Sequence, residues 1–186
     1  MDRSMRAKQV PQKAYLFDFD DTLVKTTAKV HIYKDGRRIK SLTPEEYNTY
    51  EIQPGETQNM EDFVDPRIIM KATPYKMWPA LVNIDHAKKS GRSTSDIYIL
   101  TARSPQARLP IHNFLTNAGI DIPLKNIITI GFDDGRPHDI PAAKERELRK
   151  IKDEYPEVFF YDDSESNIEI ASKIGGITTR LVDWNK

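Results

Sequence analysis

The strongest constraint on the fold is a series of short apolar runs that alternate with longer segments of helical spacing. Runs of four to six residues are typical of buried strands, and five of them stand at residues 14–17, 97–100, 127–130, 158–161 and 177–182. Several of the intervening segments begin near a proline and end at a glycine, as helices commonly do. Strands that alternate with helices require crossover connections, so the sequence predicts an α/β fold with a Rossmann-like, doubly wound parallel sheet.

The stretch between the first apolar run and the first helical segment departs from this alternation. Residues 29–34 alternate with period two, Asp35-Gly36 is a two-residue hairpin signal, and residues 37–42 are expected to form the second strand of the hairpin. The sequence Thr43-Pro44-Glu45-Glu46 has the capping-box pattern that begins a helix. Residues 53–73 are acidic and show no period, so we expect them to be irregular.

We expect this stretch to be an insertion, because a strand-to-helix connection needs only a few residues and about fifty are present. The predicted organisation is a small cap insertion at residues 24–74 and a main α/β core at residues 13–23 and 75–186. Residues 1–12 are polar and slightly basic, and we expect them to form a flexible N-terminal arm.

Composition excludes several classes of protein. The chain has 186 residues, with 28 Lys and Arg against 28 Asp and Glu, and a net charge of zero argues against a generally cationic nucleic-acid binder. The absence of cysteine excludes disulfides, a cysteine nucleophile and thiolate metal ligands. The sequence has no apolar run long enough to span a bilayer and no apolar leader. We therefore expect a cytoplasmic protein without a membrane partner, whose oligomeric state stays open.

Two aspartates directly follow the first predicted strand. In a parallel sheet, ligands bind beyond the carboxyl ends of the strands, where Asp18 and Asp20 stand with one residue between them. In an extended segment this spacing points both carboxylates to one side, where they repel unless a cation lies between them or one is protonated. The pair therefore indicates either a Mg²⁺ site or a nucleophile beside a general acid/base, whereas a solvated acidic turn is the simpler alternative.

Polar residues also follow other predicted strands. Thr101 can donate its hydroxyl to a phosphoryl oxygen, although threonine is common at strand ends. Lys144, near the start of a predicted helix, can reach an anionic intermediate, although most helical lysines are solvated. Adjacent carboxylates are costly without a cation, so Asp162 and Asp163, with Asn167 beyond them, are expected to supply metal ligands.

These pieces, in this order, resemble the haloacid dehalogenase-like (HAD) superfamily of phosphohydrolases. The resemblance covers about residues 13–23 and 75–182, and its motifs are Asp18-x-Asp20-x-Thr22, Thr101, Lys144, and Asp162-Asp163 with Asn167. Asp21 stands where many members carry glycine. An acid two residues after the nucleophile is typical of the phosphatases and phosphomutases of the superfamily. The resemblance therefore implies hydrolysis of a phosphate ester.

The resemblance also implies a role for each residue. Asp18 would attack the phosphoryl group and become an aspartyl-phosphate, while Asp20 would protonate the leaving oxygen and later deprotonate the hydrolytic water. Mg²⁺ would be held by the Asp18 carboxylate, the Asp20 carbonyl and Asp163, with Asp162 bound directly or through water. Thr101 and Lys144 would bind phosphoryl oxygens. Phosphoryl transfer needs mainly such positioning and charge neutralisation.

A closer resemblance is to the 3′-phosphatase domain of phage polynucleotide kinase-phosphatase. It rests on Leu100-Thr101-Ala102-Arg103-Ser104 and on the approach from Asp139 to Lys144. It implies that Arg103 clamps the substrate phosphate and that Asp139 supports the site. The substrate would then be a polynucleotide 3′-phosphate end or a nucleotide.

The charge pattern of the insertion bears on the substrate. Residues 25–40 carry six basic residues against one acid, and residues 45–65 carry seven acids and no base. A basic hairpin that begins near Lys25, a candidate substrate-binding residue, can guide a nucleic-acid backbone or attract any phosphoester. It can equally be a solvated ribbon whose lysines discourage edge pairing. A phosphatase of small metabolites such as sugar phosphates, and a catalytically inactive binding module, are the alternative functions.

Overall fold

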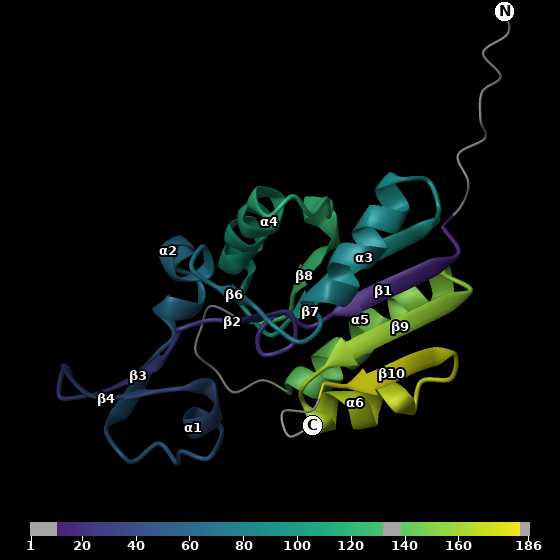
Figure 1. Ribbon diagram of the computed structural model, residues 1–186. Helices are drawn as coiled ribbons and strands as arrows, with labels where there is room; N and C mark the ends of the chain where they lie inside the picture. Colours follow the sequence, from purple (N-terminus) through teal and green to yellow (C-terminus); the bar gives the residue numbers. More distant parts are fainter. Residues whose placement is uncertain (1–10, 132–138, 183–186) are drawn as a thin grey trace, which may run out of the picture.

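Five parallel strands form the central sheet of the protein (Figure 1). The computed structural model describes residues 11–131 and 139–182. The strands are β1 (Lys13–Phe17), β7 (Ser95–Thr101), β8 (Ile127–Thr129), β9 (Glu157–Asp162) and β10 (Ile177–Leu181). Each lies at one of the five apolar runs, so the predicted parallel sheet is confirmed. The expected arm at residues 1–12 lies outside the described residues except for its last two.

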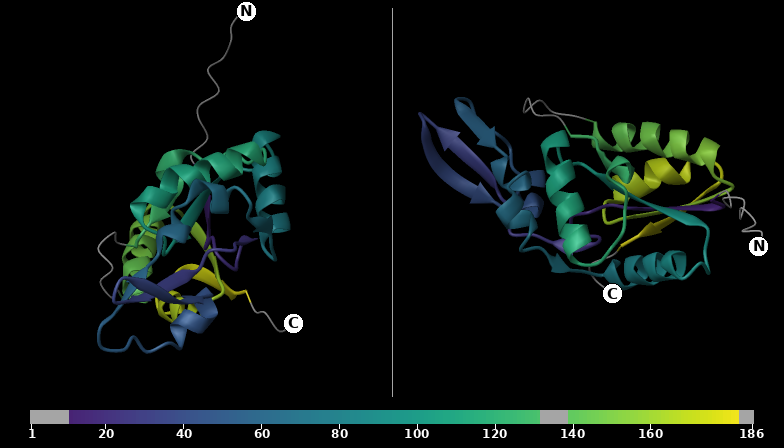
Figure 2. Two further views of the ribbon diagram at one scale, coloured as in Figure 1. Left: turned by 90° about the vertical axis from the view of Figure 1, so that its left-hand side faces the viewer. Right: turned by 90° about the horizontal axis from the view of Figure 1, so that it is seen from above.

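Helices cover both faces of this sheet, as a doubly wound fold requires (Figure 2). The helices on one face are α3 (Trp78–Lys89) and α4 (Arg108–Asn117), and those on the other are α5 (Ile140–Glu154) and α6 (Glu165–Ser172). Short 3₁₀ turns, η2 (Pro105–Ala107) and η3 (Leu124–Asn126), precede α4 and β8. No helix in the described ranges combines the length and the apolar composition that crossing a bilayer requires.

The side chains of β1 show why the sheet is buried on both faces. Tyr15 and Phe17 pack into the apolar cluster under α3 and α4, whereas Ala14 and Leu16 pack into the cluster under α5 and α6. This alternation is the two-residue period of a strand. Phe17 also stacks on Tyr161 of β9, with ring centroids 4.8 Å apart. The central strand is thereby fixed in register beside β9.

The order of the strands places a site at the end of β1. The sheet runs β10-β9-β1-β7-β8, so the chain moves outward from β1 through β7 and β8 and then returns to the other side of β1 to form β9 and β10. The direction of winding therefore reverses between β1 and β9. In open α/β sheets the crevice beyond such a switch point is where ligands bind.

The residues between β1 and α3 form a separate layer beyond the carboxyl end of the sheet (Figures 1 and 2). Its three-stranded antiparallel sheet has the order β4-β3-β5, and a two-stranded pair, β2 with β6, joins it to the core. The strands are β2 (Val24–Lys25), β3 (Val30–Lys34), β4 (Arg37–Leu42), β5 (Glu56–Asn59) and β6 (Thr73–Pro74). The helices are α1 (Pro44–Asn48), the 3₁₀ turn η1 (Glu61–Phe63) and α2 (Pro66–Ile69).

The structure corrects one expectation for this layer. The hairpin at β3 and β4 and the capping box at Thr43 and Glu46 are present as predicted. The expectation of an irregular stretch at residues 53–73 is wrong, because this stretch contains β5, η1, α2 and β6. Strand β5 has the sequence Glu-Thr-Gln-Asn, without apolar alternation, and it is held by main-chain pairing with β3. Such a strand leaves no periodic signal in the sequence.

Candidate active site

The chain turns sharply where β1 ends, and the turn presents Asp18 at the switch point. The main-chain N–H of Asp18 donates to the carbonyl of Tyr161 at 2.9 Å, which fixes Asp18 between β1 and β9. The N–H groups of Leu23 and Val24 then return to the carbonyl of Phe19. Asp21 closes this turn with a left-handed φ of 59°. Glycine adopts this conformation without strain and aspartate tolerates it, which accounts for either residue at this position.

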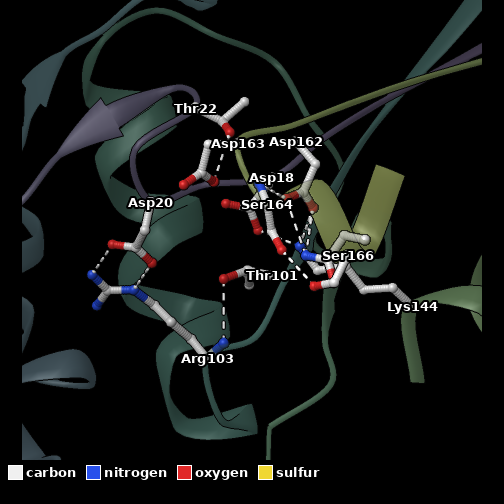
Figure 3. A network of polar contacts seen from close by, with 11 residues as sticks. Asp18, Asp20, Thr22, Thr101, Arg103, Lys144, Asp162, Asp163, Ser164 and Ser166 are labelled. Carbon is white, nitrogen blue, oxygen red and sulfur yellow. Dashed lines mark hydrogen bonds and ion pairs between the residues drawn. The ribbon is translucent and has the colours of Figure 1, made fainter. Parts of the chain in front are cut away.

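Lys144 lies between two buried carboxylates in the centre of the site (Figure 3). Its Nζ lies 2.5 Å from Oδ1 of Asp18 and 2.6 Å from Oδ2 of Asp162. Burial lowers the pKa of Lys144, but the charges of Asp162 and Asp18 outweigh it and raise this pKa above its usual value. The lysine is therefore held as an ammonium although its side chain is only 2% exposed.

Asp162 and Asp163 have different environments. Asp162 is fully buried, and its oxygens already accept from Lys144, from the N–H of Ser164 at 2.8 Å and from the amide of Asn167 at 3.0 Å. Asp163 is half-buried and accepts from the hydroxyl of Thr22 at 3.3 Å. Burial and the neighbouring Asp162 raise the pKa of Asp163 to about 6. Asp163 is therefore the better placed of the two to bind an added cation.

Asn167 supports Asp162 through its amide nitrogen. The nitrogen donates to both oxygens of Asp162 at 3.0 Å, whereas a metal would be bound through the amide oxygen, so the role of Asn167 as a metal ligand stays a prediction. The Oδ1 of Asn167 is buried and accepts no hydrogen bond from the residues that the structure describes. A buried acceptor of this kind is costly unless a donor reaches it.

Arg103 and Thr101 come from the end of β7 and the loop after it. The hydroxyl oxygen of the buried Thr101 accepts from the main-chain N–H of Arg103 at 3.2 Å. The Arg103 guanidinium donates from Nε and Nη2 to the two oxygens of Asp20, at 2.8 and 2.7 Å. In the structure this side chain holds Asp20, whose carboxylate matches the planar guanidinium. That Arg103 clamps the substrate phosphate, as the resemblance implies, stays a prediction.

The structure does not bring Asp139 and Lys25 into the centre of the site. Asp139 is the exposed N-cap of α5 and accepts from the N–H of Ala142 at 3.0 Å. Among the described residues, it supports Lys144 by fixing the start of the helix. Lys25 is exposed on β2, with its Nζ 4.8 Å from the centre of the Tyr75 ring. Its charge lowers the pKa of Asp21, which burial and Asp20 raise, so Lys25 lies at the edge of the acid cluster.

The donor set at the end of β1 fits Mg²⁺. Among the described residues, no three acidic or histidine side chains form a ready-made metal cage. Mg²⁺ does not require one, since one or two carboxylates, water and substrate phosphate usually hold it. Burial raises the pKa of Asp18 well above its usual range, and the pull of Lys144 is opposed by the charges of Asp162 and Asp163. One ammonium is therefore too little positive charge for this cluster, and a divalent cation would balance it.

Three residues that contact the site were not expected from the sequence. Phe63 and Thr26, both from the insertion, contact the Arg103 guanidinium. Gly131, after β8, approaches the Arg103 loop so closely that an added Cβ would lie 2.2 Å from the carbonyl oxygen of Ala102. An aromatic residue, a threonine and a glycine outside any motif give no sequence signal for such contacts.

Replacing Gly131 by alanine is expected to displace the Arg103 loop and to lower the stability of the fold. The backbone shift that removes such an overlap typically lowers the free energy of unfolding by about 1–3 kcal/mol. The matched control is Gly175→Ala, because an added Cβ at Gly175 would meet nothing within 4 Å. The melting temperature should decrease for Gly131→Ala and stay near wild type for the control. Equal behaviour of the two variants would contradict the assigned contact.

Comparisons with known proteins bear on the fold. No protein-family model matches the sequence, and no curated protein matches it in sequence. A chain in the structure of the Pnkp1/Rnl/Hen1 RNA repair complex is similar at a TM-score of 0.57 and 16% identity, covering 99% of this chain and 49% of that one. The HAD domain of effector protein Lem4 from Legionella pneumophila, in an inactive mutant, gives a TM-score of 0.51 at 14% identity, covering 96% and 88%. The chain has the HAD-like fold.

The HAD-like fold agrees with the resemblance inferred from the motifs. This chain spans about half the length of the two chains of Pnkp1/Rnl/Hen1 complexes that it matches, 49% and 48% of them. In this chain, Asp18, Lys144 and Asp162 lie in contact, and Asp163 follows Asp162 directly. Asp20 and Arg103 form a second pair at the same edge of the sheet (Figure 3).

Proposed function

We propose that this HAD-like protein is a Mg²⁺-dependent phosphomonoester hydrolase that works through an aspartyl-phosphate on Asp18. The observation that carries the proposal is the position of Asp18, buried at the switch point with Lys144 Nζ at 2.5 Å. A second carboxylate, Asp20, follows two residues later at the same edge of the sheet. Two carboxylates in different surroundings suit a nucleophile and a general acid/base.

The proposed reaction has two steps. An oxygen of Asp18 attacks phosphorus, the bond between phosphorus and the ester oxygen breaks, and Asp20 gives its proton to that leaving oxygen. Asp20 then takes a proton from water, the water oxygen attacks phosphorus, and the bond to Asp18 breaks to release inorganic phosphate. Lys144 and the Thr101 hydroxyl would donate to the phosphoryl oxygens.

Mg²⁺ would be held by the carboxylates of Asp18 and Asp163 and by the main-chain carbonyl of Asp20. When bound, it supplies positive charge that offsets the negative charge of the carboxylates and of the phosphoryl group. Asp162 would act indirectly, because its oxygens are already bonded to Lys144, Ser164 and Asn167.

We propose a polynucleotide 3′-phosphate end or a nucleotide as the substrate. The motif resemblance to a 3′-phosphatase domain supports it, and so does the likeness to a chain of an RNA repair complex. The basic side chains of the β3–β4 hairpin, Lys34, Arg37, Arg38 and Lys40, are all exposed. A group of exposed cations suits a chain of phosphates that extends beyond the site. Sugar phosphates are the second candidate, because Mg²⁺, Lys144 and Asp18 would contact only the phosphoryl group.

A substrate panel tests the proposed function. Phosphate release would be measured with 3′-phosphate oligonucleotides, 3′- and 5′-mononucleotides and sugar phosphates, with Mg²⁺ and with a chelator. We expect Mg²⁺-dependent release, fastest from the oligonucleotides and weakened by salt. Release from sugar phosphates that exceeds the others and ignores salt would overturn the substrate assignment. No Mg²⁺-dependent release from any ester would overturn the chemistry.

The double variant Arg37→Gln/Arg38→Gln tests the role of the hairpin in that panel. Both residues are exposed on β4, so the fold should persist. We expect KM for oligonucleotides to rise several-fold, whereas KM for mononucleotides should not change. The slope of log KM against the logarithm of salt concentration should decrease by about one for each lost phosphate contact. The matched control, Arg149→Gln/Lys173→Gln, removes two exposed charges that pair with Glu145 and Glu169. An equal effect of both double variants would remove the hairpin from substrate binding.

A further inference from the structure

The guanidinium of Arg103 joins the inserted layer to the active site. Its side chain is 2% exposed, and its bidentate contact with Asp20 occupies Nε and one hydrogen of Nη2. Nη1 donates to the main-chain carbonyl of Phe63, and Nη2 also donates to the hydroxyl of Thr26 at 3.3 Å. Phe63 and Thr26 belong to the insertion, whereas Arg103 belongs to the core. The insertion therefore supplies part of the contacts around the Arg103 guanidinium, which itself contacts Asp20.

Aromatic rings fix the same guanidinium. Its central carbon lies 5.2 Å from the centre of the Phe63 ring and 5.5 Å from the centre of the Phe19 ring. A cation over an aromatic face is attracted to it, and the attraction is stronger where water is excluded. Because the guanidinium is planar and rigid, a change in its orientation would misalign both hydrogen bonds to Asp20. The two rings therefore help to set the position of the Asp20 carboxylate.

Phe63 is itself held on both sides along the chain. The preceding residue, Asp62, accepts from the N–H of Lys29 at 3.0 Å and pairs with His31 at 3.3 Å. The following residue, Val64, packs against the apolar cluster of the core. The Phe63 carbonyl is thus a fixed acceptor for Arg103. Thr26 adds a direct contact, since its hydroxyl lies 3.4 Å from Oδ1 of Asp20.

We propose that the insertion positions the acid/base Asp20, with Phe63 and Thr26 as positioning residues. Phe63 acts through Arg103, and Thr26 acts both through Arg103 and by its own contact with Asp20. The proposal rests on the proposed phosphatase function, in which Asp20 transfers its proton to the leaving oxygen as the ester bond breaks. A small displacement of such a group costs much of its effect, because proton transfer requires hydrogen-bond distance. The insertion then completes the catalytic geometry in addition to covering the site.

A comparison of substrates with different leaving groups distinguishes this positioning role from a purely structural one. A nucleoside 3′-oxygen leaves poorly as an alkoxide and needs a proton, whereas p-nitrophenolate leaves readily as an anion. The ratio kcat/KM includes only the steps up to departure of the leaving group. It therefore excludes the later activation of water by Asp20. A displaced Asp20 should lower kcat/KM for a 3′-phosphonucleoside much more than for p-nitrophenyl phosphate.

The experiment uses Phe63→Leu, which removes the ring and keeps the carbonyl, and Thr26→Val, which removes the hydroxyl. We expect kcat/KM for thymidine 3′-phosphate to decrease at least about tenfold relative to p-nitrophenyl phosphate, a part of the 10²–10⁴-fold that acid–base catalysis supplies. The matched control is Tyr50→Leu, because this ring of the insertion contacts Lys40 and not Arg103. Its ratio of the two substrates should stay at the wild-type value.

A double-mutant cycle completes the test. In an Asp20→Asn background, Phe63→Leu should not lower kcat/KM further for either substrate, because the carboxylic acid that it positions has already been removed. An equal decrease on both substrates in Phe63→Leu and Thr26→Val would overturn the positioning role and leave a structural one. Wild-type protein that hydrolyses neither substrate with Mg²⁺ would overturn the proposed function instead. If Phe63→Leu fails to fold, Thr26→Val carries the same comparison.

Discussion

Replacing Asp18 by asparagine is expected to lower Mg²⁺-dependent phosphate release by at least about 10⁴-fold while the protein remains folded. The amide keeps the shape of the carboxylate and can still accept from Lys144, which lies 2.5 Å from Oδ1 of Asp18. It lacks the charged oxygen that attacks phosphorus in the proposed mechanism. The loss should therefore appear in the reaction rate and not in the fold.

The stability of this variant provides an independent check. Burial raises the pKa of Asp18 well above its usual value, so the folded state disfavours the charged form that the unfolded chain carries at neutral pH. Removing that charge removes the penalty. The Tm of metal-free Asp18→Asn at neutral pH should consequently be at least as high as that of the wild type. A large decrease in Tm would show that activity was lost through unfolding.

The measurement should include the covalent intermediate and a control. Acid quenching during turnover of a labelled substrate should trap phosphate on the wild-type chain and none on Asp18→Asn. The matched control is Asp139→Asn, which keeps the N-cap that accepts from Ala142 and lies outside the acid cluster. Its activity should stay close to wild type. Activity of Asp18→Asn within tenfold of wild type would refute the nucleophilic role.

The central sheet and the place of the site could be predicted because both follow from local periodicity. Apolar runs such as residues 14–17 and 158–161 specify strands, and helices between them require parallel pairing. Parallel pairing then brings the residues after β1 and β9 to one edge. Asp18 and Asp162 were thereby expected to be neighbours, and Lys144 Nζ lies within 2.6 Å of both.

The pairing of charges within the site could not be predicted from local pattern. Asp162 and Asp163 are adjacent residues of the same type, so the sequence does not distinguish them. In the fold, Asp162 accepts hydrogen bonds from Lys144 and Asn167, whereas Asp163 stays half-buried. The resemblance implied only a phosphate as the partner of Arg103, and its contacts with Asp20 and the Phe63 carbonyl come from the three-dimensional approach of distant segments. Such contacts depend on packing between segments far apart in the chain.

Strand β5 shows the same limit for secondary structure. Its four polar residues, Glu56–Asn59, have no period, and β3 provides the main-chain partners that make them a strand. Tertiary pairing overrides weak β-propensity in this case. The capping box at Thr43 and Glu46 is the opposite case. Its hydrogen bonds join residues three apart, so the local sequence predicts them.

Replacing Lys144 by methionine is expected to cause the largest loss of stability among single substitutions in the site. The ammonium lies between the carboxylates of Asp18 and Asp162, and its side chain is 2% exposed. Removing it leaves two buried acids without their counter-ion. Breaking a buried ion pair from one side typically costs about 3–5 kcal/mol. In a chain of this size that corresponds to a decrease in Tm of about 6–20 °C.

Two comparisons separate this effect from a general effect on α5. Lys150→Met removes a lysine from the exposed side of the same helix, where Lys150 pairs with Glu147 at 2.7 Å, and it should change stability by no more than about 0.5 kcal/mol. Adding Asp162→Asn to Lys144→Met should recover part of the lost stability, because one of the two unpaired charges is then neutral. The double variant should nevertheless stay inactive, since it lacks the ammonium that binds the phosphoryl group in the proposed mechanism. If Lys144→Met melts like Lys150→Met, the buried contacts do not carry the charge balance of the site.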